Sequence, residues 1–378
     1  MLIFKVLIMK KIQVGLLFFM MTFAGWTQTA NCWSGYRGNQ NLTGVSTASI
    51  PTQAELLWTF QTNDNIKASP VVCNDRIVVG SADGNIYCLG MDGKLLWKFE
   101  TPNAIEAAAL ILDNKVYIGN MDGTFYALDL MTGKKIWEYV TENQIVGAAN
   151  WWKSGNKTYL VVGSYDYYLH CVDASTGIGL WKYESDNYIN GAASCSNGKA
   201  IFGGCDGFLH VVDIISGNGE RKIDVATYVA GSAAIEGTKA WIGDYDGKFS
   251  QVDLAKGNIA WRWEDPGTRL PFVASPAVYG SRVVTGNHDK HVYCYDKNTG
   301  ELQWRFNTGN RVEASPVIAG AKALVANMRG DLFVLNLVTG KPEWNYELGA
   351  AIVGNPAIAN NRIIVTAIDG AVYCFGKK

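Results

Sequence analysis

The residues of this chain that most resemble a metal site are His288-Asp289-Lys290-His291, where two imidazoles and a carboxylate stand close together. Imidazole and carboxylate groups are zinc ligands in many proteins. The same residues, however, occupy the place of a tight turn in a pattern that repeats along the chain. Side chains in such a turn are normally solvated, so we expect a turn here and no metal site.

Two other features suggest chemistry on first inspection. Thr132-Gly133-Lys134-Lys135 has phosphate-loop residue types, but it lies between two strand-like segments and no helix follows it, which a phosphate loop requires. His170 and His210 stand where other repeats carry tyrosine, so we expect both to be packing residues. No Ser/His/Asp set stands out either. The residues therefore predict a protein that is not an enzyme.

The N-terminus predicts export. Lys10-Lys11 precede an apolar stretch that is too short to span a bilayer, which is typical of a signal peptide over residues 1–25, with cleavage possible up to residue 30. Loss of the three leader lysines takes the net charge from −1 to −4, and no basic stripe for nucleic acid is present. We expect a mature chain without a transmembrane segment, in the periplasm, on the periplasmic face of the outer membrane, or secreted.

Eight cysteines in an exported chain would ordinarily indicate a disulfide framework. Four of them fall at one point of four different repeats, and such points should lie farther apart than the roughly 7 Å between Cα atoms that a disulfide allows. These four are Cys88, Cys171, Cys294 and Cys374. The remaining four, Cys32, Cys73, Cys195 and Cys205, have no assignment, and we expect mostly free thiols. A lipoprotein would use Cys32, but Thr29-Ala30-Asn31 is a poor lipobox, and the state of Cys32 stays open.

A repeat dominates the rest of the chain. Residues 105–139 contain four apolar strand-like segments, separated by turns at Asp113-Asn114, Asp122-Gly123 and Thr132-Gly133. Asp-Gly suits a two-residue turn because glycine accepts positive φ. The middle turn recurs every 39 to 44 residues, at Asp83, Asp122, Asp166, Asp206, Asp246, Asp289, Arg329 and Asp369. Eight copies of a four-stranded unit predict eight blades.

The fourth strand of each repeat carries a tryptophan, which Arg221 replaces in the fourth repeat. These residues are Trp97, Trp137, Trp181, Trp261, Trp304 and Trp344. The last repeat stops after its third strand, and the missing segment is found at the other end of the chain, around Trp58. We therefore predict an all-β, eight-bladed β-propeller of four-stranded antiparallel blades over residues 31–378, a single domain closed by the N-terminal strand joining the last blade.

The start of each repeat has small residues, as expected where eight strands converge on one axis. The second position of this segment varies, and all eight such residues should ring one mouth of the channel. Lys67, Glu106, Asn190 and Glu313 are our candidates there for contact with a small ligand or a partner loop, against the alternative that they are solvated rim residues. In the third repeat, Trp152, Tyr165 and Tyr167 are candidates for a partner surface, whereas Trp151 is expected in the core.

The stretch Ala127-Leu128-Asp129-Leu130-Met131-Thr132-Gly133-Lys134-Lys135-Ile136-Trp137 resembles the tryptophan-docking repeat of the pyrroloquinoline-quinone (PQQ)-like propellers. Residues 33–38, WSGYRG, are similar to an N-terminal signature of that superfamily. The resemblance covers six of eight blades. It implies that each tryptophan packs on a glycine turn of the neighbouring blade, and it implies fold rather than chemistry.

Two groups of this superfamily offer contrasting functions. The resemblance to BamB-type outer-membrane assembly proteins, closest in size and motif, implies a scaffold that binds another envelope protein. Quinoprotein dehydrogenases, which bind PQQ with Ca²⁺, carry adjacent cysteines and long insertions that this chain lacks. We therefore expect a monomeric, non-enzymatic scaffold without a cofactor. A small-ligand-binding propeller and a PQQ-dependent dehydrogenase are the alternatives.

Overall fold

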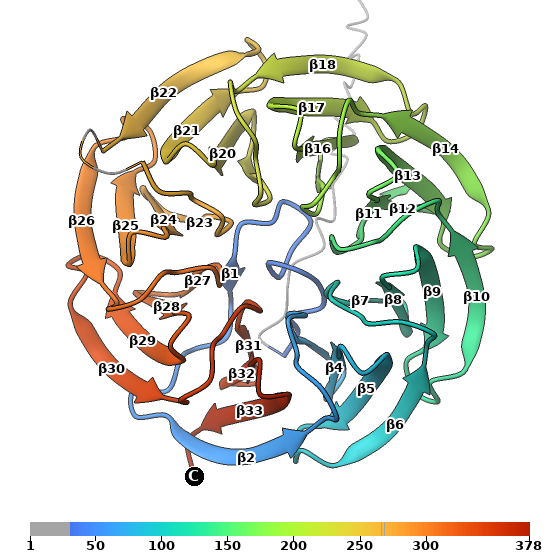
Figure 1. Cartoon of the computed structure of the whole chain (residues 1–378), viewed down its shortest axis with the longest axis horizontal. Helices are drawn as coiled ribbons and strands as arrows, with labels where there is room; N and C mark the ends of the chain where they lie inside the picture. The colour runs from blue at the N-terminus through green and yellow to red at the C-terminus, as the bar shows by residue number, and fades with distance from the viewer. Residues whose placement is uncertain (1–30, 266, 268) are drawn as a thin grey trace, which may run out of the picture.

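The computed structural model describes residues 31–265, 267 and 269–378, so the predicted leader lies outside the described residues. The described chain forms eight sheets around one axis, each built on four antiparallel strands, and β1 (Val45–Ser46) adds a parallel strand to one of them (Figure 1). The predicted all-β, eight-bladed propeller is confirmed. No helix of the described residues is long and apolar enough to cross a membrane.

Each blade is a four-stranded meander whose first strand is innermost. Blade 1 contains β3 (Val71–Cys73), β4 (Arg76–Gly80), β5 (Asn85–Gly90) and β6 (Leu95–Glu100). Blade 2 contains β7 (Leu110–Leu112), β8 (Lys115–Gly119), β9 (Thr124–Asp129) and β10 (Lys135–Val140). Blade 3 contains β11 (Asn150–Ser154), β12 (Lys157–Gly163), β13 (Tyr168–Asp173) and β14 (Gly179–Glu184). Blade 4 contains β15 (Ser194–Ser196), β16 (Lys199–Gly203), β17 (Phe208–Asp213) and β18 (Gly219–Asp224).

The second half of the ring repeats this plan. Blade 5 contains β19 (Ala234–Glu236), β20 (Lys239–Gly243), β21 (Lys248–Asp253) and β22 (Asn258–Glu264). Blade 6 contains β23 (Ala277–Tyr279), β24 (Arg282–Gly286), β25 (His291–Asp296) and β26 (Leu302–Asn307). Blade 7 contains β27 (Val317–Ala319), β28 (Lys322–Ala326), β29 (Asp331–Asn336) and β30 (Pro342–Glu347), with β1 (Val45–Ser46) alongside β27. Blade 8 contains β31 (Ala357–Ala359), β32 (Arg362–Thr366), β33 (Ala371–Gly376) and β2 (Glu55–Gln61).

Blade 8 joins the two ends of the described chain. Its outer strand β2 pairs antiparallel with β33, and Trp58 lies opposite Cys374. This pairing puts Trp58 where the other outer strands carry their tryptophan, because Trp97 likewise lies opposite Cys88 in blade 1. The predicted closure by the N-terminal strand is confirmed, and no outer strand is missing from the ring.

The tryptophans of the outer strands contact the next blade. Each indole donates a hydrogen bond of 2.9 to 3.2 Å to a backbone carbonyl of the turn there, as in Trp58 to Met91 and Trp97 to Leu130. At six of the seven junctions a glycine lies under the indole, and its φ is positive; a Cβ on Gly133, for example, would come within 2.7 Å of Trp97. The turn therefore needs glycine for both its conformation and the close approach.

Small residues surround the axis. The sequence suggests that they lie within the innermost strands, but they come just before these strands. Their backbone N–H groups bond to a side chain of the next blade instead of to a second strand. This chain of bonds runs from Ala192 through Ser232, Ser275, Ser315 and Asn355 to Ser69, with distances of 2.6 to 2.9 Å. Neighbouring blades are thus linked at the axis as well as at the rim.

The N-terminal residues 33–46 form a segment, here called the plug, that runs through the middle of the ring (Figure 1). It hydrogen-bonds to the innermost strand of each of the eight blades. In ring order, the plug residues that make these bonds are Trp33, Ser34, Gln40 (to blades 3 and 4), Asn41, Thr43, Gly44 and Ser46. The plug therefore closes the axial channel from one side.

Two side chains anchor the plug on the axis. Leu42, which is 2% exposed, packs against Ala108, Ala148 and Ala192, the three blades where alanine replaces the hydroxyl or amide of the axial ring. Arg37 is fully buried and donates from Nη2 to the Pro276 carbonyl at 3.0 Å. Burial lowers the pKa of Arg37 to about 10. The sequence signature around Arg37 is therefore part of the channel closure.

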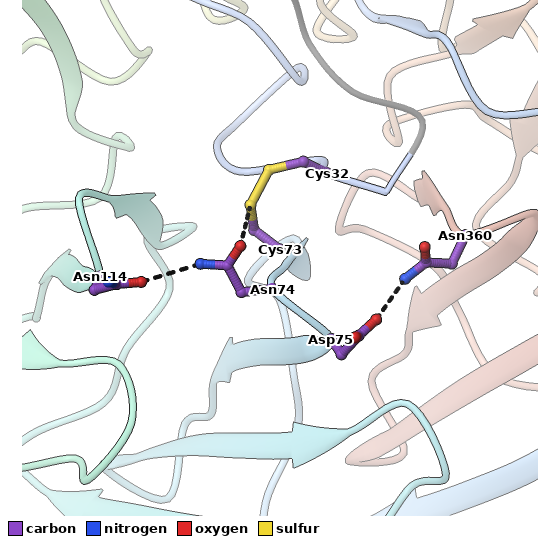
Figure 2. The surroundings of a disulfide bond; sticks show 6 residues. All are labelled: Cys32, Cys73, Asn74, Asp75, Asn114 and Asn360. Atoms are coloured by element: carbon purple, nitrogen blue, oxygen red, sulfur yellow. Dashed lines mark hydrogen bonds between the residues drawn. A yellow bond between two sulfur atoms is a disulfide. The ribbon is translucent and has the colours of Figure 1, made fainter.

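Most of the cysteines are free thiols, as expected, but one pair that the sequence left unassigned is bonded. Cys32, directly before the plug, forms a disulfide with Cys73 at the end of β3, so these two are not free thiols (Figure 2). The other six cysteines are free, and all except Cys205 are buried. The repeat pattern does not indicate this pairing, because Cys32 lies in a segment that has no counterpart in the other repeats.

His170 and His210 are packing residues, as predicted. His210 is fully buried; it bonds to Asp206 at 2.7 Å, to the Tyr183 hydroxyl at 3.1 Å, and stacks on Phe202. Burial favours a raised pKa for the Asp206 carboxyl, but the hydrogen bond and charge of His210 outweigh it and hold that pKa below its ordinary value. In blade 1, Tyr87 makes the bond to Asp83 instead, and Phe60 fills the place of Tyr183.

This comparison of blades yields a prediction. His210→Ala should lower the free energy of unfolding by about 2 to 4 kcal/mol, because it leaves a cavity and an unpartnered carboxylate. His210→Tyr should overpack against the Tyr183 hydroxyl, and the double variant His210→Tyr/Tyr183→Phe should recover most of the loss. Because the pKa of Asp206 is lowered on folding, its stabilisation is present at neutral pH and is lost as pH falls below about 4. Urea denaturation at pH 7 and pH 3 measures the stability of each variant and its dependence on pH. Equal stability of His210→Tyr and the double variant would contradict the inferred packing of residue 210 against residue 183.

Candidate functional site

The plug leaves a cup open on the other face of the ring. Each innermost strand runs from one face to the other, so residues before it and after it lie on opposite sides. We call the face of Cys32 and Cys73 the plug face and the opposite face the cup face. The axial cup has a volume of about 150 Å³, and Tyr36 of the plug is part of its lining.

The structure brings together at this cup all eight residues that the repeat places at the channel mouth: Lys67, Glu106, Val146, Asn190, Ala230, Val273, Glu313 and Val353. Their contribution to binding stays a prediction. Glu264, Asp265, Gly267 and Arg269, at the loop before blade 6, do not line the cup.

The charged groups of the cup are paired. Lys67 forms a 2.6 Å ion pair with Glu106. Glu313 lies 3.3 Å from Arg311 and 3.5 Å from His288. Burial lowers the pKa of His288, which favours the neutral imidazole at neutral pH. The cup is therefore polar but close to electrically neutral.

Asn190 connects the cup to a group of tyrosines. Its Nδ2 donates to the Tyr228 hydroxyl at 2.6 Å and to Cys205 Sγ at 3.3 Å. Its Oδ1 is buried and has no hydrogen-bond partner among the described residues. A buried carbonyl oxygen of this kind is an acceptor available to a donor that enters the cup.

Five tyrosines, here called the tyrosine arc, lie beside the cup on blades 3 to 5: Tyr165, Tyr167, Tyr188, Tyr228 and Tyr245. Their ring centroids are 4.8 Å apart between Tyr165 and Tyr188, 5.1 Å between Tyr167 and Tyr188, and 4.4 Å between Tyr228 and Tyr245. Tyr167, Tyr188 and Tyr245 are 38 to 43% exposed. The arc thus presents three exposed aromatic rings to solvent.

The predicted partner-surface residues separate into two places. Tyr165 and Tyr167 belong to the tyrosine arc, at the turn between β12 and β13. Trp152 lies in β11 and packs, partly buried, against the core between blades 3 and 4. Trp151 is buried, as predicted. Sequence reasoning missed Tyr188 and Tyr228, which lie in links between blades, where the repeat pattern is weakest. It also missed Tyr245, which lies between β20 and β21 at the position that Tyr165 occupies in blade 3.

The metal-like residues of blade 6 do not form one cluster. His288 faces Glu313, whereas His291 bonds to the Asp289 backbone carbonyl at 3.0 Å. The Asp289 carboxylate accepts a hydrogen bond from Tyr293. Over residues 31–265, 267 and 269–378, no group of three His, Cys, Asp or Glu side chains is arranged to hold a metal ion.

These features define the protein as an eight-bladed propeller of the PQQ-like class with a plugged channel. The family model described as outer membrane protein assembly factor BamB matches residues 44–151, 146–290 and 288–378. The chain therefore belongs to the BamB family. No curated protein matches it.

Solved structures show the same fold at low sequence identity. BamB from Moraxella catarrhalis is 20% identical with a TM-score of 0.72, covering 86% of this chain and 98% of that one. A europium-containing methanol dehydrogenase is 14% identical with a TM-score of 0.75, covering 93% and 99%. Quinohemoprotein alcohol dehydrogenase from Comamonas testosteroni is 13% identical with a TM-score of 0.76, covering 92% and 81%. At these identities the likeness concerns the fold alone.

Proposed function

We propose that this protein is an exported, non-enzymatic scaffold that binds another envelope protein through the tyrosine arc, in the assembly of outer-membrane proteins. Its membership of the BamB family and its predicted signal peptide support this proposal. The observation that carries it is the tyrosine arc itself. Tyrosine presents a large, rigid surface with a polar end, and interface hot spots are enriched in it.

The position of the arc favours a protein partner. Its exposed rings come from turns and links of three consecutive blades, so the backbone beneath them is fixed by the ring. A partner that covers them buries aromatic area without having to order it first, which lowers the entropic cost of binding. The plug face has no such group of exposed rings among the described residues.

Crosslinking in the envelope tests this function. A photoreactive residue at position 188 should capture an outer-membrane protein or a component that assembles one. Tyr188→Ser with Tyr245→Ser should weaken binding of the captured protein by about 30-fold or more, as expected for hot-spot side chains. Tyr279→Ser is the matched control, because Tyr279 is 46% exposed at the end of β23 on the plug face. Equal binding by the arc and control variants would overturn the proposal.

A second function, binding of a small polar ligand in the axial cup, is favoured by one observation. The buried Asn190 Oδ1 lacks a partner in a cavity lined by both donors and acceptors. A thermal-shift screen of small polar compounds against the protein and Asn190→Ala tests it. A ligand that stabilises the protein but not the variant is the expected result, and a response of both proteins alike would remove this function.

The cup does not fit PQQ. PQQ carries three carboxylates, whereas the cationic groups at the cup, Lys67 and Arg311, are already paired with Glu106 and Glu313. Its volume of about 150 Å³ also falls below the roughly 300 Å³ at which pockets for drug-sized ligands such as PQQ begin. We therefore propose that the scaffold works without PQQ, and a large thermal stabilisation by PQQ with Ca²⁺ would sink the non-enzymatic proposal.

A further inference from the structure

The disulfide between Cys32 and Cys73 lies where the plug enters the ring (Figure 2). Cys73 ends β3, and the turn that follows it is tied to both neighbouring blades. Asn74 donates to Asn114 of blade 2 at 3.1 Å, and Asn360 of blade 8 donates to Asp75 at 3.2 Å. The disulfide therefore fastens the plug to a turn that is itself held on both sides.

The residue after Cys32 is held against blade 1 by its backbone. Trp33 is 1% exposed, and its backbone exchanges two hydrogen bonds with Val72, of 2.6 and 2.9 Å. The pairing of Trp33 with Val72 sets Cys32 beside Cys73. The plug in its native position thus presents the two sulfur atoms to each other.

We propose that Cys32 and Cys73 form a redox latch that locks the plug in the channel, and that Cys32 is consequently not a site of lipid attachment. The sulfur of Cys32 can form only one such covalent bond, either to Cys73 or to a lipid. The inference rests on the plug alone and does not depend on the proposed scaffold function.

The oxidation balances with an oxidant of the cell envelope. The two thiols lose two protons and two electrons to the disulfide of a thiol-oxidising protein, which becomes a dithiol, while the Cys32–Cys73 bond forms. Competing pairings are blocked in the folded ring. Cys88, Cys171, Cys195, Cys294 and Cys374 are buried, and Cys205 lies on the cup face.

The latch also encloses the strand that closes the ring. The cysteines are 41 residues apart, and the loop between them contains the plug and β2. If β2 leaves β33, the closed loop keeps it near blade 1. For a loop of this length the chain-entropy relation predicts about a thousandfold gain in the folding equilibrium constant.

Mass spectrometry of the protein purified from the envelope tests the chemical state of Cys32. We expect an intact mass two hydrogens below that of the reduced chain, no acyl group, and alkylation of both cysteines only after reduction and unfolding. A diacylglyceryl thioether on Cys32, or alkylation of both thiols without reduction, would overturn the proposal.

Serine variants test the mechanical role. Cys32→Ser, Cys73→Ser and the double variant should each lower the folding equilibrium constant by about a thousandfold, and trypsin should cleave at the buried Arg37 faster than in the parent protein. Cys205→Ser is the control and should change neither measurement. Equal tryptic rates in the parent and all latch variants would refute a lock on the plug, even if the disulfide is present.

Discussion

Replacing Phe60 by proline should open the ring at its seam. Thr62 donates its N–H to the Gly370 carbonyl, and donors alternate along an antiparallel strand, so the N–H of Phe60 also points at β33. Proline removes that donor and leaves its acceptor unpaired at a cost of about 1 to 3 kcal/mol, and loss of the half-buried Phe60 ring, which contacts Tyr87, adds about 2 to 3 kcal/mol. The sum approaches the lower end of the stability of many proteins, about 5 to 15 kcal/mol.

Phe99→Pro in blade 1 is the matched control. Phe99 occupies the same position of β6 and contacts Tyr126 as Phe60 contacts Tyr87. Its strand, however, follows directly from β5 in the chain, so the local damage leaves the ring closed. In hydrogen exchange, Phe60→Pro should lose protection throughout β31, β32 and β33, whereas Phe99→Pro should lose it mainly in β6. Equal loss in both variants would mean that the seam is no weaker than any other junction.

The repeat made the ring predictable. Seven blades carry all three turns and the last blade carries the first two, so its missing outer strand could be found at the N-terminus by likeness of residues 56–60 to residues 95–99. The same register placed eight residues at one mouth of the channel, and the structure brings all of them to one cup. Because the pattern is repeated eight times, a departure in one copy, such as Arg221 in place of tryptophan, does not hide it.

Features that occur once were not predictable in this way. The plug has a signature in the sequence, but nothing in residues 33–46 reveals that they contact all eight blades, because most of these contacts use backbone groups that any residue has. Among the described residues of the plug, only Gln40 and Ser46 use their side chains to bond to innermost strands. The Cys32–Cys73 disulfide depends on the path of the plug and was missed for the same reason. The tyrosine arc escaped in part because Tyr188 and Tyr228 lie between blades, outside the repeated frame.

Introducing a charge at the tip of the plug should release it from the axis. Leu42→Ala should lower the free energy of unfolding by about 2 to 4 kcal/mol, since it leaves a cavity among Ala108, Ala148 and Ala192. Leu42→Asp should cost several kcal/mol more, because the carboxylate would be buried beside three methyl groups without a partner. Trypsin should then reach Arg37 in the native state. The latch should keep the released plug attached to blade 1.

The pH dependence separates charge from volume at this position. Burial raises the pKa of the introduced carboxyl above its unfolded value of about 3.9, so the penalty is complete above the raised pKa and shrinks as pH falls through it. Leu42→Asn, similar in size to Leu42→Asp and uncharged, is the control, and its stability relative to the parent protein should not recover as pH falls. Denaturation of both variants at pH 7 and pH 5, each relative to the parent protein, provides the comparison. If Leu42→Asp is no less stable than Leu42→Ala, or if both polar variants recover equally, the tip of the plug is not held in an apolar site.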